Sequence, residues 1–159
     1  MKTTLLCLEC GLAISRGVHE FSQRIYGHSL CMKDQYLIEE SGATAHVVDL
    51  YLALKERNFP IILEYFDGHK HVDMALPGKL YIEVNGPYHL AKQQAMVDLT
   101  RSVYSLEKKI PTIIIPNALL ENQQSFTHAV EELSKACKVM LGQRSILSSM
   151  LAVTAAQLQ

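Results

Sequence analysis

Residues 60–85 constrain the fold more than any other part of the sequence, because three extended apolar runs follow one another across two short turns. Asp67-Gly68 is a strong hairpin signal between the first two runs, and Pro77-Gly78 marks a turn between the second and the third. Turns this short join neighbouring antiparallel strands, so the segment predicts a three-stranded meander. The runs cover residues 60–66, 71–76 and 80–85.

Apolar residues at helical spacing flank this meander on both sides. They predict a helix over 44–57 before it and two helices after it, over 90–109 and over 126–140. Three consecutive isoleucines between Pro111 and Pro116 fit a buried strand that separates the last two helices. The predicted order is helix, three-stranded meander, helix, strand, helix, which is an α/β architecture.

Length and composition divide the chain into three zones. With 159 residues, of which 48% are hydrophobic, one domain and a small accessory module are expected. Residues 1–40 hold three of the four cysteines and form the module, 41–141 form the α/β domain, and 142–159 form an uncharged C-terminal tail after Arg144. The tail is expected to dock as a helix on the core or on a second copy of the chain, so a homodimer is one expectation.

The two ends of the chain carry no signal for a membrane. Residues near the N-terminus lack the apolar stretch of a signal peptide, and the apolar tail is shorter than a bilayer-spanning helix. We therefore expect a cytoplasmic protein without a membrane partner. Four cysteines in that setting favour metal binding or core packing over disulfides.

The cysteines of the module form two half-sites for a metal ion. Cys7 and Cys10 make a C-x2-C pair, and Cys31 with Asp34 repeats the spacing with a carboxylate in the fourth place. The interval between the pairs is typical of zinc ribbons, so we predict a zinc-ribbon-like module that holds a structural Zn²⁺ through three thiolates and one carboxylate.

Two alternatives stay open for this cluster. His28, three residues before Cys31, competes with Asp34 as the fourth ligand, or the fourth ligand has been lost and the thiols are free. Cys137 lies in the apolar stripe of the last predicted helix, where a packed core cysteine is expected instead.

Polar side chains mark the last two strands of the meander. Asp73 lies in the second strand, and Glu83 and Asn85 share one face of the third because side chains alternate with a period of two. Pairing around the intervening turn places Asp73 nearly opposite Glu83. Two carboxylates so close repel each other unless a cation or a proton intervenes. Mg²⁺ or Mn²⁺, which prefer oxygen ligands, would resolve the conflict, and a solvated sheet face is the alternative.

The run HVDMALPGKLYIEVNGPYH, which ends at His89, resembles the PD-(D/E)XK nuclease superfamily, in particular the branch related to very-short-patch-repair endonucleases. Asp73 matches its first aspartate, Glu83 its Asp/Glu position, and His89 the histidine that follows the glycine. Asn85 stands where the family has a lysine or a second acidic residue. The cysteines also resemble the zinc-binding extension of some members.

This resemblance covers residues 44–140 and implies a restriction-endonuclease-like core. It implies an Mg²⁺ or Mn²⁺ held by Asp73, Glu83 and the main-chain carbonyl of Val84, with His89 assisting proton transfer. The expected activity is metal-dependent hydrolysis of phosphodiester bonds in DNA, as an endonuclease of repair or restriction.

Further residues have weaker claims on the same site. Asn85 is neutral, and Lys70 at the start of the second strand is a candidate for the missing positive charge. His71 is a second candidate for proton transfer. Asp49 and Glu64 are candidates for acidic neighbours of the metal. Asp98 and Arg101 form a D-x-x-R pair that resembles the family's next helix but also suits an intrahelical ion pair.

The charge balance limits how the protein could bind DNA. The formal net charge is −1, which excludes binding through a simple basic surface. Together with the neutral Asn85 and with Asp34 in a cysteine's place, it supports a rival hypothesis. In that alternative the chain is a catalytically weakened nuclease-fold protein that binds nucleic acid or a protein partner.

Overall fold

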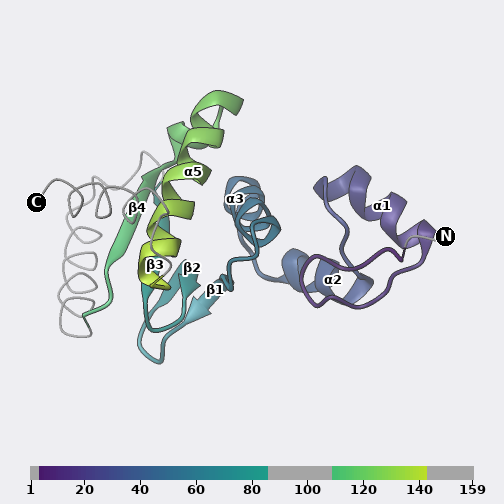
Figure 1. Cartoon of the computed structure of the whole chain (residues 1–159), viewed down its shortest axis with the longest axis horizontal. Helices are drawn as coiled ribbons and strands as arrows, with labels where there is room; N and C mark the ends of the chain where they lie inside the picture. The colour runs from purple at the N-terminus through teal and green to yellow at the C-terminus, as the bar shows by residue number, and fades with distance from the viewer. Residues whose placement is uncertain (1–3, 86–108, 143–159) are drawn as a thin grey trace, which may run out of the picture.

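The computed structural model describes residues 4–85 and 109–142 (Figure 1). In chain order its elements are α1 (Arg16–Tyr26), α2 (Met32–Glu40), α3 (Ala45–Glu56), β1 (Ile62–Phe66), β2 (His71–Leu76), β3 (Leu80–Asn85), β4 (Thr112–Pro116), the 3-10 helix η1 (Asn117–Leu120) and α5 (Gln123–Met140). The α/β class is confirmed, and the four predicted strands and the predicted first and last helices of the α/β domain are present. The helix expected over 90–109 and the tail after Gly142 lie outside the described residues.

The four strands form one sheet in the order β1-β2-β3-β4. The first three are antiparallel, which confirms the predicted meander, and β4 pairs parallel to β3. Leu76 pairs with Leu80 across the turn, where Gly78 has a φ of 69° that glycine adopts without steric cost. At its other end the ladder between β2 and β3 reaches Met74 and Ile82.

Helices α3 and α5 pack on the face of the sheet that carries Met74 and Ile82 (Figure 1). Both of these residues are fully buried, in one hydrophobic cluster with residues of both helices. From α3 and α5 this cluster includes Leu50, Leu52, Leu54, Val130, Leu133 and Cys137. The packed position of Cys137 agrees with the core role expected for it.

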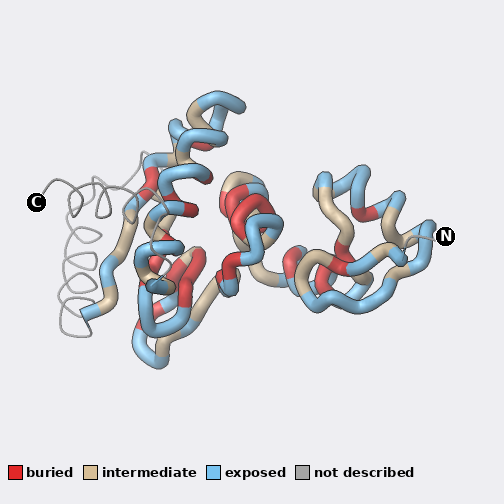
Figure 2. Tube along the Cα trace, in the orientation of Figure 1, coloured by how far each residue is buried: buried red, intermediate tan, exposed pale blue. Residues whose placement is uncertain are grey.

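The same hydrophobic cluster continues into the N-terminal module. Leu30 and Ile38 of the module belong to it, as does Cys7. Helix α3 lies between the module and the rest of the α/β domain (Figure 2), and it is buried on several sides, with Leu52 and Tyr51 as well as Leu50 in the interior. A helix that is apolar around most of its circumference needs cover on more than one side, and the module supplies part of it.

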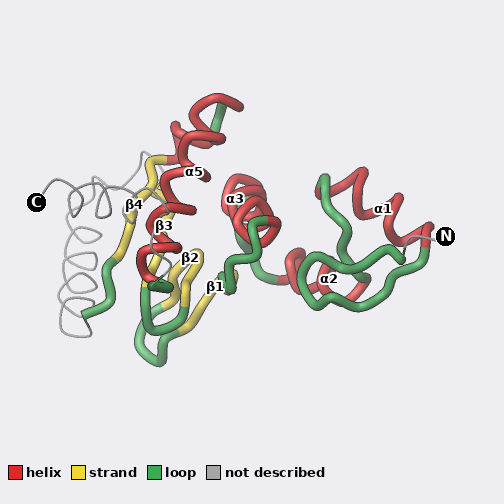
Figure 3. The backbone as a smooth tube through the Cα atoms, viewed as in Figure 1, coloured by secondary structure: helices red, strands yellow, loops and turns green. Residues whose placement is uncertain are grey.

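The cysteine spacing predicted a zinc-ribbon-like module, and the described part of this module is mainly helical. It consists of α1, α2 and the loops around them (Figure 3), and its strand-like pairing in the described residues is a single bridge between Leu6 and Ala13. Local capping explains α1. The Ser15 hydroxyl accepts a hydrogen bond from the N–H of Val18, and Gly27 ends the helix in the left-handed conformation.

Within the described part of the chain, no helix combines the length and the apolar character that crossing a membrane requires.

Candidate functional site

The structure brings Cys7, Cys10, Cys31 and Asp34 together. Their three sulfur atoms and one carboxylate oxygen all lie within 4.8 Å of one another, so the four side chains could hold a metal ion. In the described residues this is the one group of three or more Cys, His, Asp or Glu side chains that converges in this way. Cys7 and Asp34 are buried, and Cys10 is exposed.

Local backbone structure positions both halves of this cluster. The first half is a tight turn in which the N–H of Cys7 donates to the carbonyl of Leu12 (2.8 Å) and the N–H of Gly11 donates to the carbonyl of Cys7 (3.0 Å). Gly11 has a φ of 70°, which explains a glycine directly after Cys10. In the second half, Cys31 precedes the first turn of α2, so it and Asp34 lie at a helix N-terminus, where negative charge is favoured.

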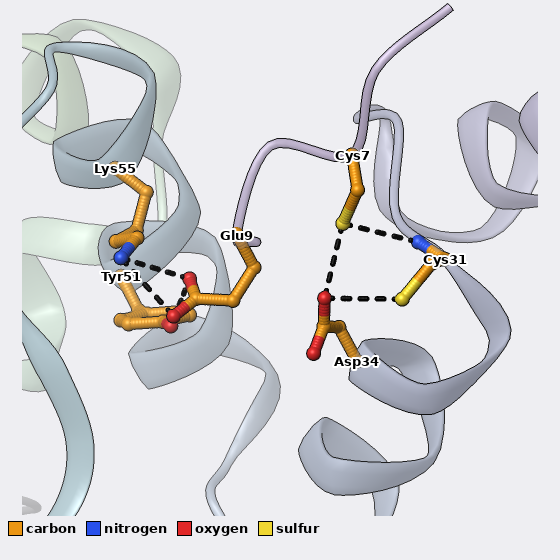
Figure 4. Close-up of polar contacts among 6 residues, drawn as sticks. All are labelled: Cys7, Glu9, Cys31, Asp34, Tyr51 and Lys55. Carbon is orange, nitrogen blue, oxygen red and sulfur yellow. Dashed lines mark hydrogen bonds and ion pairs between the residues drawn. The ribbon is translucent and has the colours of Figure 1, made fainter. Parts of the chain in front are cut away.

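Hydrogen bonds already link the ligand atoms (Figure 4). Asp34 Oδ2 accepts from the thiols of Cys7 (3.0 Å) and Cys31 (3.1 Å). The backbone N–H of Cys31 donates to the sulfur of Cys7 (3.2 Å), and the sulfurs of Cys10 and Cys31 are 3.8 Å apart. No disulfide joins any of the four cysteines of the chain. The Asp34 carboxylate thus holds the Cys7 and Cys31 thiols close together.

The acid–base properties of the cluster follow from this crowding. The N–H of Leu12 lowers the pKa of the Cys10 thiol, but the Asp34 carboxylate, burial and the neighbouring thiols together raise it to about 12. Burial is the main cause that raises the pKa of Cys31. Burial also acts to raise the pKa of Asp34, yet hydrogen bonds from the three thiols lower it overall. Without a cation the Asp34 carboxylate therefore carries the charge, and the Cys10 and Cys31 thiols keep their protons.

The donor set suits a metal that accepts both sulfur and oxygen. Three thiolates and one carboxylate in a compact group match the ligand types and the coordination number of Zn²⁺. His28, the rival fourth ligand, is not part of the converging group, which contains Asp34 in its place. His28 instead lines a cavity of about 430 Å³ with Asp49 of α3 and residues near the start of α5.

The carboxylates on the sheet lie at the end of the β2–β3 ladder. The β2–β3 pairing ends at Met74 and Ile82, one step before Asp73 and Glu83, so the direct opposition of these two carboxylates stays a prediction of the sequence. Asp73 Oδ2 accepts a hydrogen bond from the backbone N–H of Val84 (2.6 Å). On the side of β2 that faces β1, the register places Glu64 next to Asp73. Burial and then the Asp73 charge raise the pKa of Glu64, whose backbone has an unusual φ of 46°.

Glu83 has a positively charged partner. The ammonium of Lys70 lies 3.0 Å from Glu83 Oε1, and the Lys70 side chain is only 4% exposed. The ammonium also lies 5.2 Å from the centre of the Tyr81 ring. A buried lysine is costly unless its charge is compensated, so the carboxylate and the aromatic face explain how Lys70 is accommodated. The sequence candidate for the missing positive charge is therefore beside Glu83.

Asp67 fixes the turn that presents Lys70. Its Oδ1 accepts from the backbone N–H groups of His69 and Lys70 (both 2.9 Å), and its Oδ2 accepts from the Tyr81 hydroxyl (2.8 Å). Burial opposes these hydrogen bonds, but together they lower the pKa of Asp67. Sequence reasoning assigned Asp67 only to the hairpin turn, and the Asp-Gly pair gave no sign of the contact with Tyr81.

The remaining candidates are more scattered. Asn85 lies at the end of β3 beside Pro116 of β4, and the His71 ring packs on Phe66 with centroids 4.7 Å apart. The described carboxylates Glu64, Asp73 and Glu83 do not converge as the cysteine cluster does. Three other candidates, His89, Asp98 and Arg101, lie outside the described residues.

Comparisons with known proteins do not assign the chain to a family. No family model, no curated protein and no solved structure matches the chain. The fold and the site therefore define a mixed α/β protein with a four-stranded sheet and an N-terminal cluster that could hold a metal ion.

Proposed function

We propose that the protein is a metal-dependent nuclease, with a structural Zn²⁺ in the N-terminal module and a hydrolytic site at the end of the β2–β3 ladder. One observation carries the proposal. Asp73 and Glu83 lie one step beyond the Met74–Ile82 pair at this end of the ladder, and the buried ammonium of Lys70 contacts Glu83. Such a group of charges suits phosphodiester hydrolysis, because negative charge that develops on the phosphoryl oxygens must be stabilised.

In the proposed reaction, Asp73, Glu83 and the carbonyl of Val84 would hold Mg²⁺ or Mn²⁺. When bound, the ion supplies polarisation of the phosphoryl group and a lowered pKa of a water ligand. Lys70, whose ammonium contacts Glu83, is the candidate for the positive charge that the neutral Asn85 does not supply. His89 moves the proton of the attacking water, whose oxygen bonds to phosphorus as the P–O bond of the leaving strand breaks. The substrate class is DNA.

The test is cleavage of single-stranded, duplex and mismatched DNA by the purified protein with Mg²⁺ or Mn²⁺. Asp73→Asn is the sharpest variant, because an amide oxygen can still accept from the Val84 N–H while the charge is removed. We expect this variant to be inactive and Glu132→Gln, an exposed carboxylate on α5, to cut normally. Cleavage that survives Asp73→Asn would refute the site, and the absence of cleavage by the unmodified chain would refute the nuclease.

A second candidate function is supported by the same Lys70–Glu83 ion pair. Because Lys70 already neutralises Glu83, the chain could keep the nuclease fold and bind nucleic acid or a protein partner without cutting. Calorimetric titration with Mg²⁺ separates the two proposals. Binding that is lost in Glu83→Gln favours the nuclease, and no Mg²⁺ binding by the unmodified chain favours the binding protein.

A further inference from the structure

We propose that Glu9 couples metal binding in the N-terminal module to the docking of that module on helix α3. This inference rests on the proposed metal centre. It extends the role of the ion from folding the module to fixing the module on the α/β domain.

Glu9 connects the cysteine cluster to α3 through its carboxylate (Figure 4). It lies in the turn between Cys7 and Cys10, and its Oε2 accepts a hydrogen bond of 2.5 Å from the Tyr51 hydroxyl. The ammonium of Lys55 lies 3.1 Å from Oε1 and 3.0 Å from Oε2. The carboxylate thus receives two donors that belong to the other part of the chain.

The partners on α3 are placed for this contact. Tyr51 and Lys55 are four residues apart, so they lie on the same face of the helix. The Lys55 ammonium is 5.9 Å from the centre of the Tyr51 ring, and its side chain is only 14% exposed. Tyr51 is itself buried, and burial followed by the hydrogen bond to Glu9 raises the pKa of its hydroxyl, which therefore remains a donor. Removing one partner of a pair this sheltered costs more than removing one partner of an exposed pair.

Metal binding would restrict the conformations of the turn that contains Glu9. When Cys7 and Cys10 bind one ion, the ion closes a ring through the backbone of the turn that carries Glu9. Closing this ring removes conformational freedom that the turn has when no ion is bound. Less entropy is then lost when the carboxylate meets Tyr51 and Lys55. Because coupling is reciprocal, contact with α3 must favour metal binding as much as metal binding favours the contact.

The first measurement is Zn²⁺ affinity, by competition with a chelator. Glu9→Gln keeps the side chain's size and removes its charge, and Tyr51→Phe keeps every charge and removes the donor. We expect each to weaken Zn²⁺ binding about fivefold or more, within the usual range for coupled sites. Glu20→Gln is the matched control, because Glu20 is a module carboxylate whose partner, Arg16, lies on the exposed side of α1. It should bind Zn²⁺ like the unmodified chain.

The second measurement is hydrogen exchange followed by mass spectrometry, with Zn²⁺ and with excess chelator. In the unmodified chain, Zn²⁺ should slow exchange both in the turn around Cys7 and in residues 45–56. In Glu9→Gln the protection of the turn should persist while the Zn²⁺-dependent protection of residues 45–56 shrinks. This result separates a docking contact from a general loss of folding.

The outcomes distinguish the coupling from the metal centre itself. If the unmodified chain binds no Zn²⁺, the proposed metal centre fails and the coupling fails with it. If Zn²⁺ binds, but Glu9→Gln and Tyr51→Phe match the unmodified chain in affinity and in exchange, the coupling is wrong while the metal centre stands.

Discussion

The identity of the fourth metal ligand gives the most direct test of the structure, because the sequence left Asp34 and His28 as alternatives. The perturbation is Asp34→Ala, which removes the one oxygen donor of the converging group. Structural Zn²⁺ sites contribute about 10–16 kcal/mol in small peptides. Dividing that energy among four ligands gives ~3 kcal/mol for each, which corresponds to ~100-fold in affinity.

Three variants test this expected loss of Zn²⁺ affinity. Asp34→Ala should weaken Zn²⁺ binding by that ~100-fold factor. Asp34→Cys, which restores the fourth thiol, should bind at least as tightly as the unmodified chain. His28→Ala should leave the affinity unchanged, because His28 lines the cavity beside Asp49 and is not part of the metal cluster. Each variant is checked for folding by circular dichroism before the titration.

The assay is displacement of Co²⁺ by Zn²⁺, in which thiolate ligands give an absorption band that reports the number of sulfur donors. The result that would refute the reasoning is a loss of affinity in His28→Ala with no loss in Asp34→Ala. That outcome would mean that the carboxylate gathers the thiols only when no metal is bound and that a histidine replaces it in the metal site.

Two further predictions concern the ion pair and the turn on the sheet. Lys70→Met leaves the Glu83 carboxylate without its ammonium and should cost ~3 kcal/mol in urea unfolding. Lys135→Met, in an exposed pair, should cost much less, and equal losses would contradict the burial argument. Hydrogen bonds lower the pKa of the Asp67 carboxyl despite its burial. The contribution of Asp67 to stability is therefore present above the unfolded pKa of about 3.9, and it is lost as the pH falls through the lower folded value. Asp67→Asn should therefore be less stable at pH 7, and its unfolding free energy should fall less steeply below pH ~4. If the unfolding free energy of the variant falls as steeply as that of the unmodified chain, Asp67 does not contribute to the acid dependence of stability.

The meander and its register could be predicted because local chemistry determines them. Asp67-Gly68 and Pro77-Gly78 favour tight turns, and a tight turn at Pro77-Gly78 leads to the observed pairing of Leu76 with Leu80 and of Met74 with Ile82. The two module helices were missed because this region has few long apolar runs and the prediction for it was based on the cysteine spacing. A capping signal for α1 was nevertheless present, since Ser15 and Gly27 stand at its two ends.

The contacts that shape the sites depend on tertiary structure and could not be predicted. A lysine at the start of a strand is normally solvated, and Lys70 is buried only because Tyr81 and Glu83 approach from the neighbouring strand. Glu9 reads as an ordinary surface residue between two cysteines, and its partners are more than forty positions away. Local sequence signals do not extend over such separations.

The position of α3 between the sheet and the module affects how the chain can be divided. Leu30 and Ile38 of the module share a hydrophobic cluster with Leu50 and Leu54, so the interior is continuous across the boundary at residue 40. A fragment that starts at residue 41 would expose to water the side of α3 that carries Tyr51. The module is thus an integral part of the interior, and any shorter protein with the same sheet would need a more polar α3 in order to remain soluble.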